Sequence, residues 1–259
     1  MQRVLIIAGS DSSGGAGIQA DIKAVTCLGG YAMTAITALT VQNTLGVSDV
    51  MAVPPAIITA QAMACLDDIG ADAIKTGMLA DIAVMEAVSL VIEGAKVFTV
   101  IDPVMVAKGG HALMNHHAVD AMKALMLPLA DLLTPNAPEA AALTGLKVET
   151  EDDMRKAGEA LLAMGAKNVL IKGGHIDTPD VVDLLITRQG EHRFTSERID
   201  TRHTHGTGCT LASACAALTR EARPLEETVG LARDYVGGAI LMAPGLGQGH
   251  GPLRHNWLL

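Results

Sequence analysis

The sequence predicts a single α/β domain, a three-layer αβα sandwich built around a mostly parallel central sheet. Short apolar runs such as VLIIA (4–8) alternate along the chain with longer segments of helical periodicity. Nearly continuous apolar strands are typical of parallel sheets that are covered on both faces. No linker, repeat or low-complexity tract interrupts residues 1–259, so we predict one domain.

Strands are expected where β-branched and apolar residues cluster, and helices where apolar residues recur every three or four positions. The expected strands are 3–9, 71–78, 96–105, 130–136 and 168–174, with 181–187 and 191–199 as a hairpin divided at Gly190. The expected helices are 16–29, 81–94, one near 116–127, 137–145, 150–165, 208–221 and 225–242.

Local signals support two of these helices. In the helix at 16–29, Ile18, Ile22 and Val25 share the face that should be buried. In the helix at 150–165, Thr150 and Asp153 have the spacing of a capping box, and Gly165 is a plausible stop. Ligands of open α/β sheets bind outside the carboxyl ends of the strands. The site is therefore expected in the loops after residues 8, 77, 101, 133 and 172.

Composition excludes several classes of protein. The net charge of −9 argues against a nucleic-acid surface, which needs clustered Lys and Arg. No apolar run reaches the roughly 18 residues that a membrane helix needs. The four cysteines form neither a C-x-x-C pair nor a zinc ligand set, so a reducing cytoplasm is the simplest setting.

The first post-strand loop, GSDSSGGAGIQAD (9–21), is rich in glycine. It matches neither G-x-x-x-x-G-K-[ST] nor G-x-G-x-x-G, so both common nucleotide fingerprints fail. Two interpretations remain open: a flexible connection, or a backbone that approaches a small ligand closely, with Asp21 pointing back from the following helix.

Three later loops place polar side chains at strand ends. Asp102 in IDPVM, and Asn136 with Glu139 in TPNAPE, could hold Mg²⁺ with the help of water. Asn136 and Glu139 fit a helix N-terminal cap equally well. Lys172 in LIKGGH could contact a phosphate as a point charge, or could be an ordinary solvated lysine.

The stretch HTHGTGCTLASA (203–214) turns from two glycines into an apolar helix. The backbone N–H groups from Gly206 through Cys209 would form an anion-binding nest at that helix N-terminus. His203 and His205 precede the nest, and a histidine there is more often a hydrogen-bonded loop residue than a base.

Together these pieces resemble the ribokinase-like superfamily, and within it the hydroxymethylpyrimidine/phosphomethylpyrimidine kinases of thiamine biosynthesis. The resemblance covers nearly the whole chain and is carried by ordered motifs: AGSDSSGGAGIQADIK, TALTVQNT, IKTGML, DPVM, TPNAPEAAAL, KGGH, THGTGCTLASA and the tail GHGPL.

The resemblance implies two successive phosphorylations that use ATP and Mg²⁺, first of hydroxymethylpyrimidine and then of its monophosphate. Gln42 would bind the pyrimidine edge, because a primary amide offers both a donor and an acceptor. The other residues that it implies are Gly9, Asp21, Met78 and Val104 for substrate; Asp102 and Glu139 for metal; Asn136, Lys172 and Thr207 for ATP; and Gly206, Gly208, Cys209 and Lys172 for catalysis. It also implies a homodimer.

Cys209 stands where most ribokinase-like enzymes resemble G-x-G-D, with the aspartate as base. We expect the helix N-terminus to lower the pKa of this thiol, so that a thiolate takes the hydroxymethyl proton. The second acceptor is already a phosphate anion and would need no base. The alternative interpretation is that Cys209 is only a small residue at a tight helix start. Rival functions are a pyridoxal kinase of the same superfamily, a non-catalytic ligand sensor, and an acyl-transfer enzyme with Cys209 as nucleophile.

Overall fold

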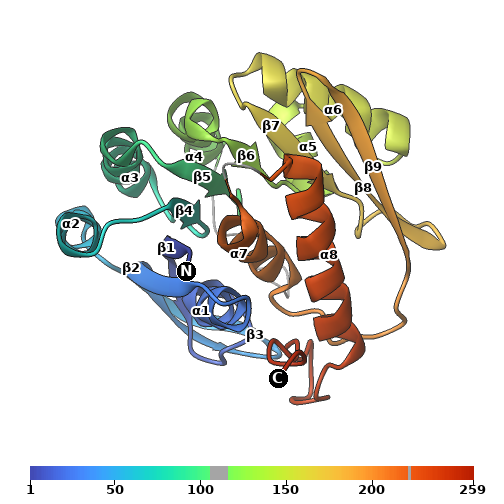
Figure 1. Cartoon of the computed structure of the whole chain (residues 1–259), viewed down its shortest axis with the longest axis horizontal. Helices are drawn as coiled ribbons and strands as arrows, with labels where there is room; N and C mark the ends of the chain where they lie inside the picture. Colours follow the sequence, from blue (N-terminus) through green and yellow to red (C-terminus); the bar gives the residue numbers. More distant parts are fainter. Residues whose placement is uncertain (106–115, 221–222) are drawn as a thin grey trace.

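The computed structural model describes residues 1–105, 116–220 and 223–259, and within them nine strands form one sheet. The strand order is β3-β2-β1-β4-β5-β6-β7-β8-β9 (Figure 1). The strands are β1 (Arg3–Asp11), β2 (Tyr31–Asn43), β3 (Gly46–Ala52), β4 (Ala73–Thr76), β5 (Phe98–Ile101), β6 (Leu132–Leu133), β7 (Asn168–Lys172), β8 (Asp180–Thr187) and β9 (Gly190–Glu197).

The centre of the sheet is parallel and its two edges are antiparallel. Strands β2, β1, β4, β5, β6 and β7 pair in parallel. Strand β3 returns antiparallel to β2, and β8 and β9 form the expected hairpin next to β7. The carboxyl ends of the parallel strands therefore meet at one edge of the molecule, where the loops of interest begin.

Helices cover both faces of the sheet, which confirms the predicted three-layer sandwich (Figure 1). One face carries α1 (Gly17–Cys27), α7 (Thr207–Leu218) and α8 (Leu225–Leu241). The other carries α2 (Pro55–Asp68), α3 (Ile82–Ala95), α4 (His116–Ala121), α5 (Ala137–Thr144) and α6 (Glu151–Ala163). Helix α4 continues as a π turn (Met122–Met126) and a 3₁₀ turn (Leu127–Leu129).

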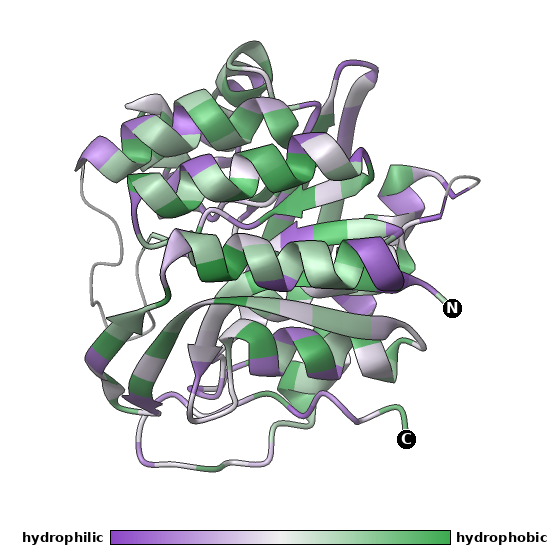
Figure 2. Cartoon of the chain, turned by 90° about the vertical axis from the view of Figure 1, so that its left-hand side faces the viewer, coloured by the Kyte–Doolittle hydropathy of each residue, from purple (hydrophilic) through white to green (hydrophobic). Residues whose placement is uncertain are grey.

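Successive residues of the central strands enter two separate cores. In β1, Val4 and Ile6 pack toward α1 and α7, whereas Leu5 and Ile7 pack toward α2 and α3. The period of two follows from the pleat of a strand. Most helices alternate hydrophobic and hydrophilic residues along their length (Figure 2), whereas α7 is buried on all sides from Thr210 to Ala217. In the part of the chain that the structure describes, no helix is long and apolar enough to cross a membrane.

Several expected elements agree with the structure, and three were missed. The capping box at α6 is confirmed: Thr150 Oγ1 accepts from the N–H of Asp153, and Asp153 Oδ2 accepts from the N–H of Thr150. The missed elements are β2, β3 and α2, which lie in a region rich in threonine and alanine that shows no clear period. Ile18 and Val25 are buried as expected, but Ile22, in the middle of α1, is 37% exposed.

Candidate active site

A cavity of about 550 Å³ opens at the carboxyl ends of the parallel strands. Its walls come from the loops after β1, β4, β5, β6 and β7, where the sequence predicted the site, together with the end of β2 and the start of α7. The predicted site residues that line it are Gly9, Gln42, Met78, Asp102, Val104, Asn136, Glu139, Lys172, Gly206, Thr207, Gly208 and Cys209. Asp21 is the predicted site residue that the cavity wall does not contain.

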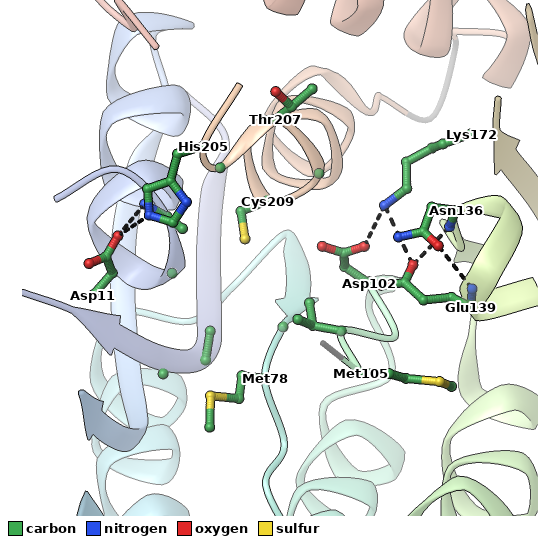
Figure 3. A pocket seen from close by; sticks show the side chains of 18 of the residues that line it. Asp11, Met78, Asp102, Met105, Asn136, Glu139, Lys172, His205, Thr207 and Cys209 are labelled. Atoms are coloured by element: carbon green, nitrogen blue, oxygen red, sulfur yellow. Dashed lines mark hydrogen bonds and ion pairs between the residues drawn. The ribbon is translucent and has the colours of Figure 1, made fainter. Parts of the chain in front are cut away.

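Figure 3 shows two groups of polar side chains facing each other across the cavity. Asp11 and His205 lie at one side, and Asp102, Glu139 and Lys172 lie at the other. Cys209 lies between the two groups, with its sulfur directed into the cavity. We call the first side the acceptor end and the second side the phosphate end, after the ligands that the sequence analysis predicts for them.

Asp11 organises the acceptor end. Its carboxylate accepts hydrogen bonds from the backbone N–H groups of Ser13, Gly15 and Ala16 and from the Ser13 hydroxyl, so it holds the glycine-rich loop closed. It also lies 2.8 Å from His205 Nε2. Burial alone would raise the pKa of Asp11, but the bonds from His205, Ser13 and Ala16 outweigh it and lower that pKa to about 2.

Gln42 reaches the same group from the end of β2. Its Nε2 atom lies 3.3 Å from His205 Nε2, and its Oε1 atom lies 3.1 Å from Thr40 Oγ1. Because His205 Nε2 already donates to Asp11, the hydrogen bond that orients the amide is the one that Thr40 Oγ1 donates to Gln42 Oε1. Met78 closes the cavity below, close to Gly9.

The two glycine-rich loops pack directly against each other. Gly206 has a φ of +82°, and a Cβ atom there would overlap the carbonyl oxygen of Gly15. A Cβ atom at Gly15 would in turn overlap the His205 ring. Side chains at these two positions would push the loops apart, which explains why both loops need glycine. The tail also braces this contact, because the N–H of His205 donates to Gly251 O.

The start of α7 is the place where the sequence predicted an anion nest. Gly206 is the N-cap, and the helix begins at Thr207. Among the described residues, the backbone N–H groups of Gly208 and Cys209 have no backbone acceptor, as expected in a first helical turn. These donors and the helix dipole favour a negative group at this point of the cavity.

The phosphate end is a cation between two carboxylates (Figure 3). Lys172 Nζ lies 2.9 Å from Asp102 Oδ1 and 4.0 Å from Glu139 Oε2. Burial opposes the charge of Lys172, but the two carboxylates outweigh it, so its pKa lies above the ordinary value. Burial raises the pKa of Glu139 to about 7, with Lys172 acting against the shift and Asp102 adding to it.

Asn136 and Glu139 form the N-terminal cap of α5, one of the two interpretations that the sequence left open. Asn136 Oδ1 accepts from the N–H of Glu139 at 2.9 Å, and Glu139 Oε2 accepts from the N–H of Asn136 at 2.8 Å. The cap occupies one carboxylate oxygen of Glu139, and Asp102 Oδ1 is occupied by Lys172 and Thr134. Glu139 also accepts a hydrogen bond from the backbone of Met105, whereas Asp102 Oδ2 is used by neither Lys172 nor Thr134. Mg²⁺ usually needs only one or two carboxylates besides water and phosphate. The donor set therefore fits a water-assisted Mg²⁺ site.

The expected acidity of Cys209 is wrong. Burial raises the pKa of the Cys209 thiol to about 11, and the nearby carboxylates Asp21 and Asp102 add to the rise. Lys75 and the N–H of Gly17 act in the opposite direction but do not outweigh it. The sequence showed the helix N-terminus, which favours a thiolate, but not the burial and the carboxylates that oppose it.

Asp21 lies beneath the cavity instead of in its wall. It is fully buried and makes two short contacts with Lys75 Nζ, at 2.8 and 2.9 Å. The expected direct contact with substrate therefore has no support in this structure, because another residue already occupies both carboxylate oxygens.

Sequence reasoning missed three residues of this region: Asp11, His205 as its partner, and Lys75. Asp11 was present in the quoted loop, where an aspartate directly after a strand and before two serines is typical of a loop that hydrogen-bonds its own backbone. Lys75 could have been noticed as a charge inside an otherwise buried strand. The pairing of Asp11 with His205, 194 positions apart, has no local signal.

The fold and the cavity define a class of protein: an α/β protein with a small-molecule cavity at the carboxyl ends of its parallel strands, beside the N-terminus of a helix. The model of the family described as Phosphomethylpyrimidine kinase matches residues 11–254. The chain belongs to this family.

Similar proteins agree with that membership. The chain is 45% identical to the hydroxymethylpyrimidine/phosphomethylpyrimidine kinase of Streptomyces coelicolor over 99% of its own length and 95% of that protein. It is 49% identical to a thiamine biosynthesis bifunctional protein of Geobacter sulfurreducens over 97% of its own length, but it spans only 52% of that protein. The pyridoxal kinase from Staphylococcus aureus in complex with AMP-PCP and pyridoxal has a TM-score of 0.92 at 35% identity, covering 100% of this chain and 94% of the other. This likeness confirms the predicted ribokinase-like fold.

Proposed function

We propose that the chain phosphorylates 4-amino-5-hydroxymethyl-2-methylpyrimidine with ATP and then phosphorylates the resulting monophosphate, in thiamine biosynthesis. The observation that carries the proposal is family membership across residues 11–254, joined to a cavity that contains both a polar acceptor end and a phosphate end. A non-catalytic sensor would not need the second end.

At the acceptor end, we assign recognition of the pyrimidine edge to Gln42. The exocyclic amino group of the substrate is a donor next to a ring nitrogen acceptor, and the Gln42 amide is complementary to that pair. Thr40 restricts the rotation of the amide through its hydrogen bond to Gln42 Oε1, which lowers the entropy lost on binding. Gly9, Met78 and Val104 supply the apolar contacts around the ring.

At the phosphate end, Lys172 and the N–H groups at the start of α7 would stabilise the phosphoryl group during transfer. Asn136 and Thr207 line the same region and would contact the nucleotide. Asp102 and Glu139 would hold Mg²⁺, which would neutralise part of the charge of the nucleotide phosphates. Cys209, between the two ends, would take the hydroxymethyl proton in the first step.

A pyridoxal kinase activity is a second candidate, favoured by the structural likeness to the Staphylococcus aureus pyridoxal kinase. Pyridoxal also carries a hydroxymethyl group on a flat heteroaromatic ring, but it lacks the amino group that Gln42 would bind. The decisive experiment is ATP turnover with hydroxymethylpyrimidine, its monophosphate and pyridoxal, measured in parallel. We expect the highest kcat/KM for the pyrimidines, and a clear preference for pyridoxal would overturn the assignment.

We also propose a cytoplasmic homodimer. The edge strand β3 and its neighbour β2 expose large apolar side chains, namely Leu39, Val41 and Met51 at 40%, 59% and 60%, with Leu45 in the turn between the strands. Exposed apolar edge strands commonly pair with another chain. Light scattering should give the mass of two chains, and the double variant Val41→Lys, Met51→Lys should give the mass of one. A monomeric parent protein would contradict the proposal.

In keeping with a reducing compartment, all four cysteines are free.

A further inference from the structure

Lys75 is a charged residue inside the sheet. It lies on the four-residue strand β4, whose residues are all buried, and its side chain has no exposed surface. Its neighbours on the adjacent strands are Ile6 and Val100. Removing an ammonium group from water costs several kcal/mol unless a partner compensates, so a lysine at this position needs a specific physical reason.

The ammonium group is held by residues from two helices. Asp21 on α1 contacts Lys75 Nζ with both carboxylate oxygens, at 2.9 and 2.8 Å. Ser213 on α7 donates its hydroxyl to Asp21 Oδ1 at 2.7 Å. Burial raises the pKa of Asp21, while Lys75 and Ser213 act against that shift; the short two-oxygen contact favours the ionised pair. The buried ion pair therefore joins β4 to α1, and the hydrogen bond from Ser213 joins α7 to that pair.

The pair lies directly under the cavity. Lys75 and the neighbouring Gly77 both belong to the cavity wall, and a Cβ atom on Gly77 would lie 3.1 Å from Lys75 Nζ. Glycine at position 77 therefore leaves only backbone between the ammonium group and the cavity. Asp21 takes two of the three directions in which an ammonium group can donate, which leaves one N–H beyond the pair.

Cys209 is the cavity residue next to this pair. It precedes Ser213 by four positions on α7, so the two side chains lie on the same face of the helix, one turn apart. Four charged groups from four elements act on the thiol: Lys75 from β4, Asp21 from α1, Asp102 after β5, and Lys172 from β7. Lys75 is the group that most strongly opposes the effect of burial on the thiol.

We propose that Lys75 is a positioning residue for the phosphoryl transfer, whose buried ammonium group stabilises the thiolate form of Cys209, and that Asp21 limits this effect. The inference rests on the proposed role of Cys209 as the base. In that role the thiolate takes the proton of the hydroxymethyl group, the acceptor oxygen bonds to the γ-phosphorus, and ADP leaves with the electron pair of the broken P–O bond. The thiol then returns its proton to solvent.

The test is the rate at which iodoacetamide alkylates Cys209, followed by peptide mass spectrometry between pH 6 and 10 in the full-length protein. Lys75→Met leaves the Asp21 carboxylate beneath the thiol and should slow alkylation at pH 8 by about tenfold, since one pKa unit is a factor of ten. Asp21→Asn leaves the ammonium group in excess and should accelerate it by about as much. Ser213→Ala removes a hydrogen bond but no charge and should change the rate less than about threefold.

Opposite signs distinguish charge from packing, because a merely structural pair would change alkylation in the same direction in both variants. Cys215 serves as the internal control: it lies on the same helix and is fully buried, so its alkylation reports opening of the fold. If both variants change the Cys209 rate in the same direction, or neither changes it while Cys215 stays protected, the proposal is wrong.

Two further measurements complete the test. If Lys75→Met fails to fold, the double variant Asp21→Asn, Lys75→Met is used, because it removes both charges. Its Cys209 should be alkylated at a rate near that of the parent protein. A rate equal to that of either single variant contradicts the proposal. The pH profile of kcat for hydroxymethylpyrimidine should shift in the same direction as alkylation. If alkylation shifts as expected but that profile does not, Lys75 controls the thiol and the proposed base is wrong.

Discussion

The acceptor end and the phosphate end of the cavity are built on different electrostatic principles. At the acceptor end, Asp11 receives hydrogen bonds from its own loop and from His205, and its pKa is lowered to about 2. At the phosphate end, the pKa of Glu139 is raised to about 7, and Glu139 and Asp102 both contact Lys172. The carboxylate at the acceptor end has all its hydrogen-bond partners within the protein. At the phosphate end, by contrast, two carboxylates share one lysine, so one negative charge has no partner of its own.

The difference matches what each end would bind. A neutral heteroaromatic alcohol is best recognised by groups that are already oriented, because little reorganisation then opposes binding. A nucleotide with its metal brings several charges, so a cluster that can exchange partners and protons is better suited to it. The following predictions test this contrast, from the largest expected effect to the smallest.

Gly206 joins the two ends, and Gly206→Ala should have the largest effect. The new Cβ atom would overlap the Gly15 carbonyl at a φ of +82°, so the two glycine-rich loops would separate and the anion nest would lose its position. Because loss of a single oxyanion donor costs about 10²–10³ in kcat, we expect kcat/KM to fall by more than about a thousandfold.

The matched control is Gly237→Ala in α8, where a Cβ atom would meet no other atom within 4 Å. We expect unchanged kinetics and a free energy of unfolding that is equal or higher by up to about 1 kcal/mol. Steady-state kinetics and thermal unfolding of both variants provide the comparison. Parent-like activity in Gly206→Ala would show that the loops need not touch.

Cys209→Ala should separate the two half-reactions. Removing a general base typically costs about 10²–10⁴ in rate, so the first phosphorylation should fall by at least about a hundredfold. The second acceptor is already an anion, and we expect that step to lose less than about tenfold. Single-turnover assays with each acceptor measure both. Loss of the second step alone would exclude Cys209 as the base.

Gln42→Leu should affect the acceptor end alone. An unpaired substrate amino group costs about 1–3 kcal/mol, which corresponds to roughly a fivefold to 150-fold loss of kcat/KM for hydroxymethylpyrimidine. The KM for ATP should not change, and the ratio of pyridoxal to pyrimidine turnover should rise. An equal loss for both acceptors would place the pyrimidine edge elsewhere in the cavity.

The two ends should respond to pH with opposite sign. The pKa of Asp11 falls from 3.8 to about 2 on folding. Its carboxylate therefore contributes about 2 kcal/mol to the free energy of unfolding above pH 4, and this contribution is lost as the pH falls toward 2. The pKa of Glu139 rises from 4.5 to about 7 on folding, so the folded protein binds this proton more tightly than the unfolded chain does. The stability gained from the bound proton is lost as the pH rises from 4.5 to 7.

Urea unfolding of Asp11→Asn and Glu139→Gln at a series of pH values measures these contributions as differences from the parent protein. The first difference should shrink toward pH 2, and the second should change between pH 4.5 and 7. If the difference in the free energy of unfolding between parent and variant does not depend on pH at either position, the proposed electrostatic contrast between the two ends is wrong.

Particular residues show how far local sequence information extends. The apolar run around Leu5 and Ile6 predicted a strand buried on both faces, and the structure places these two residues in opposite cores. The glycine-rich loops and Lys172 predicted where the cavity would lie, because the carboxyl ends of parallel strands must meet. Strand β2 was missed because its burial alternates only in part and its far end is exposed.

The sequence by itself determined the layered α/β fold, the position of the cavity and the family, since these depend on local periodicity and on motifs that can be read in order. Only the tertiary structure decided which charges meet: Asp11 with His205, Asp21 with Lys75, and Lys172 with both Asp102 and Glu139. The physical reason is that the acidity of Cys209 or Glu139 depends on burial and on charges a few ångströms away. Those neighbours come from distant strands and helices, and their distances exist only once the sheet has formed.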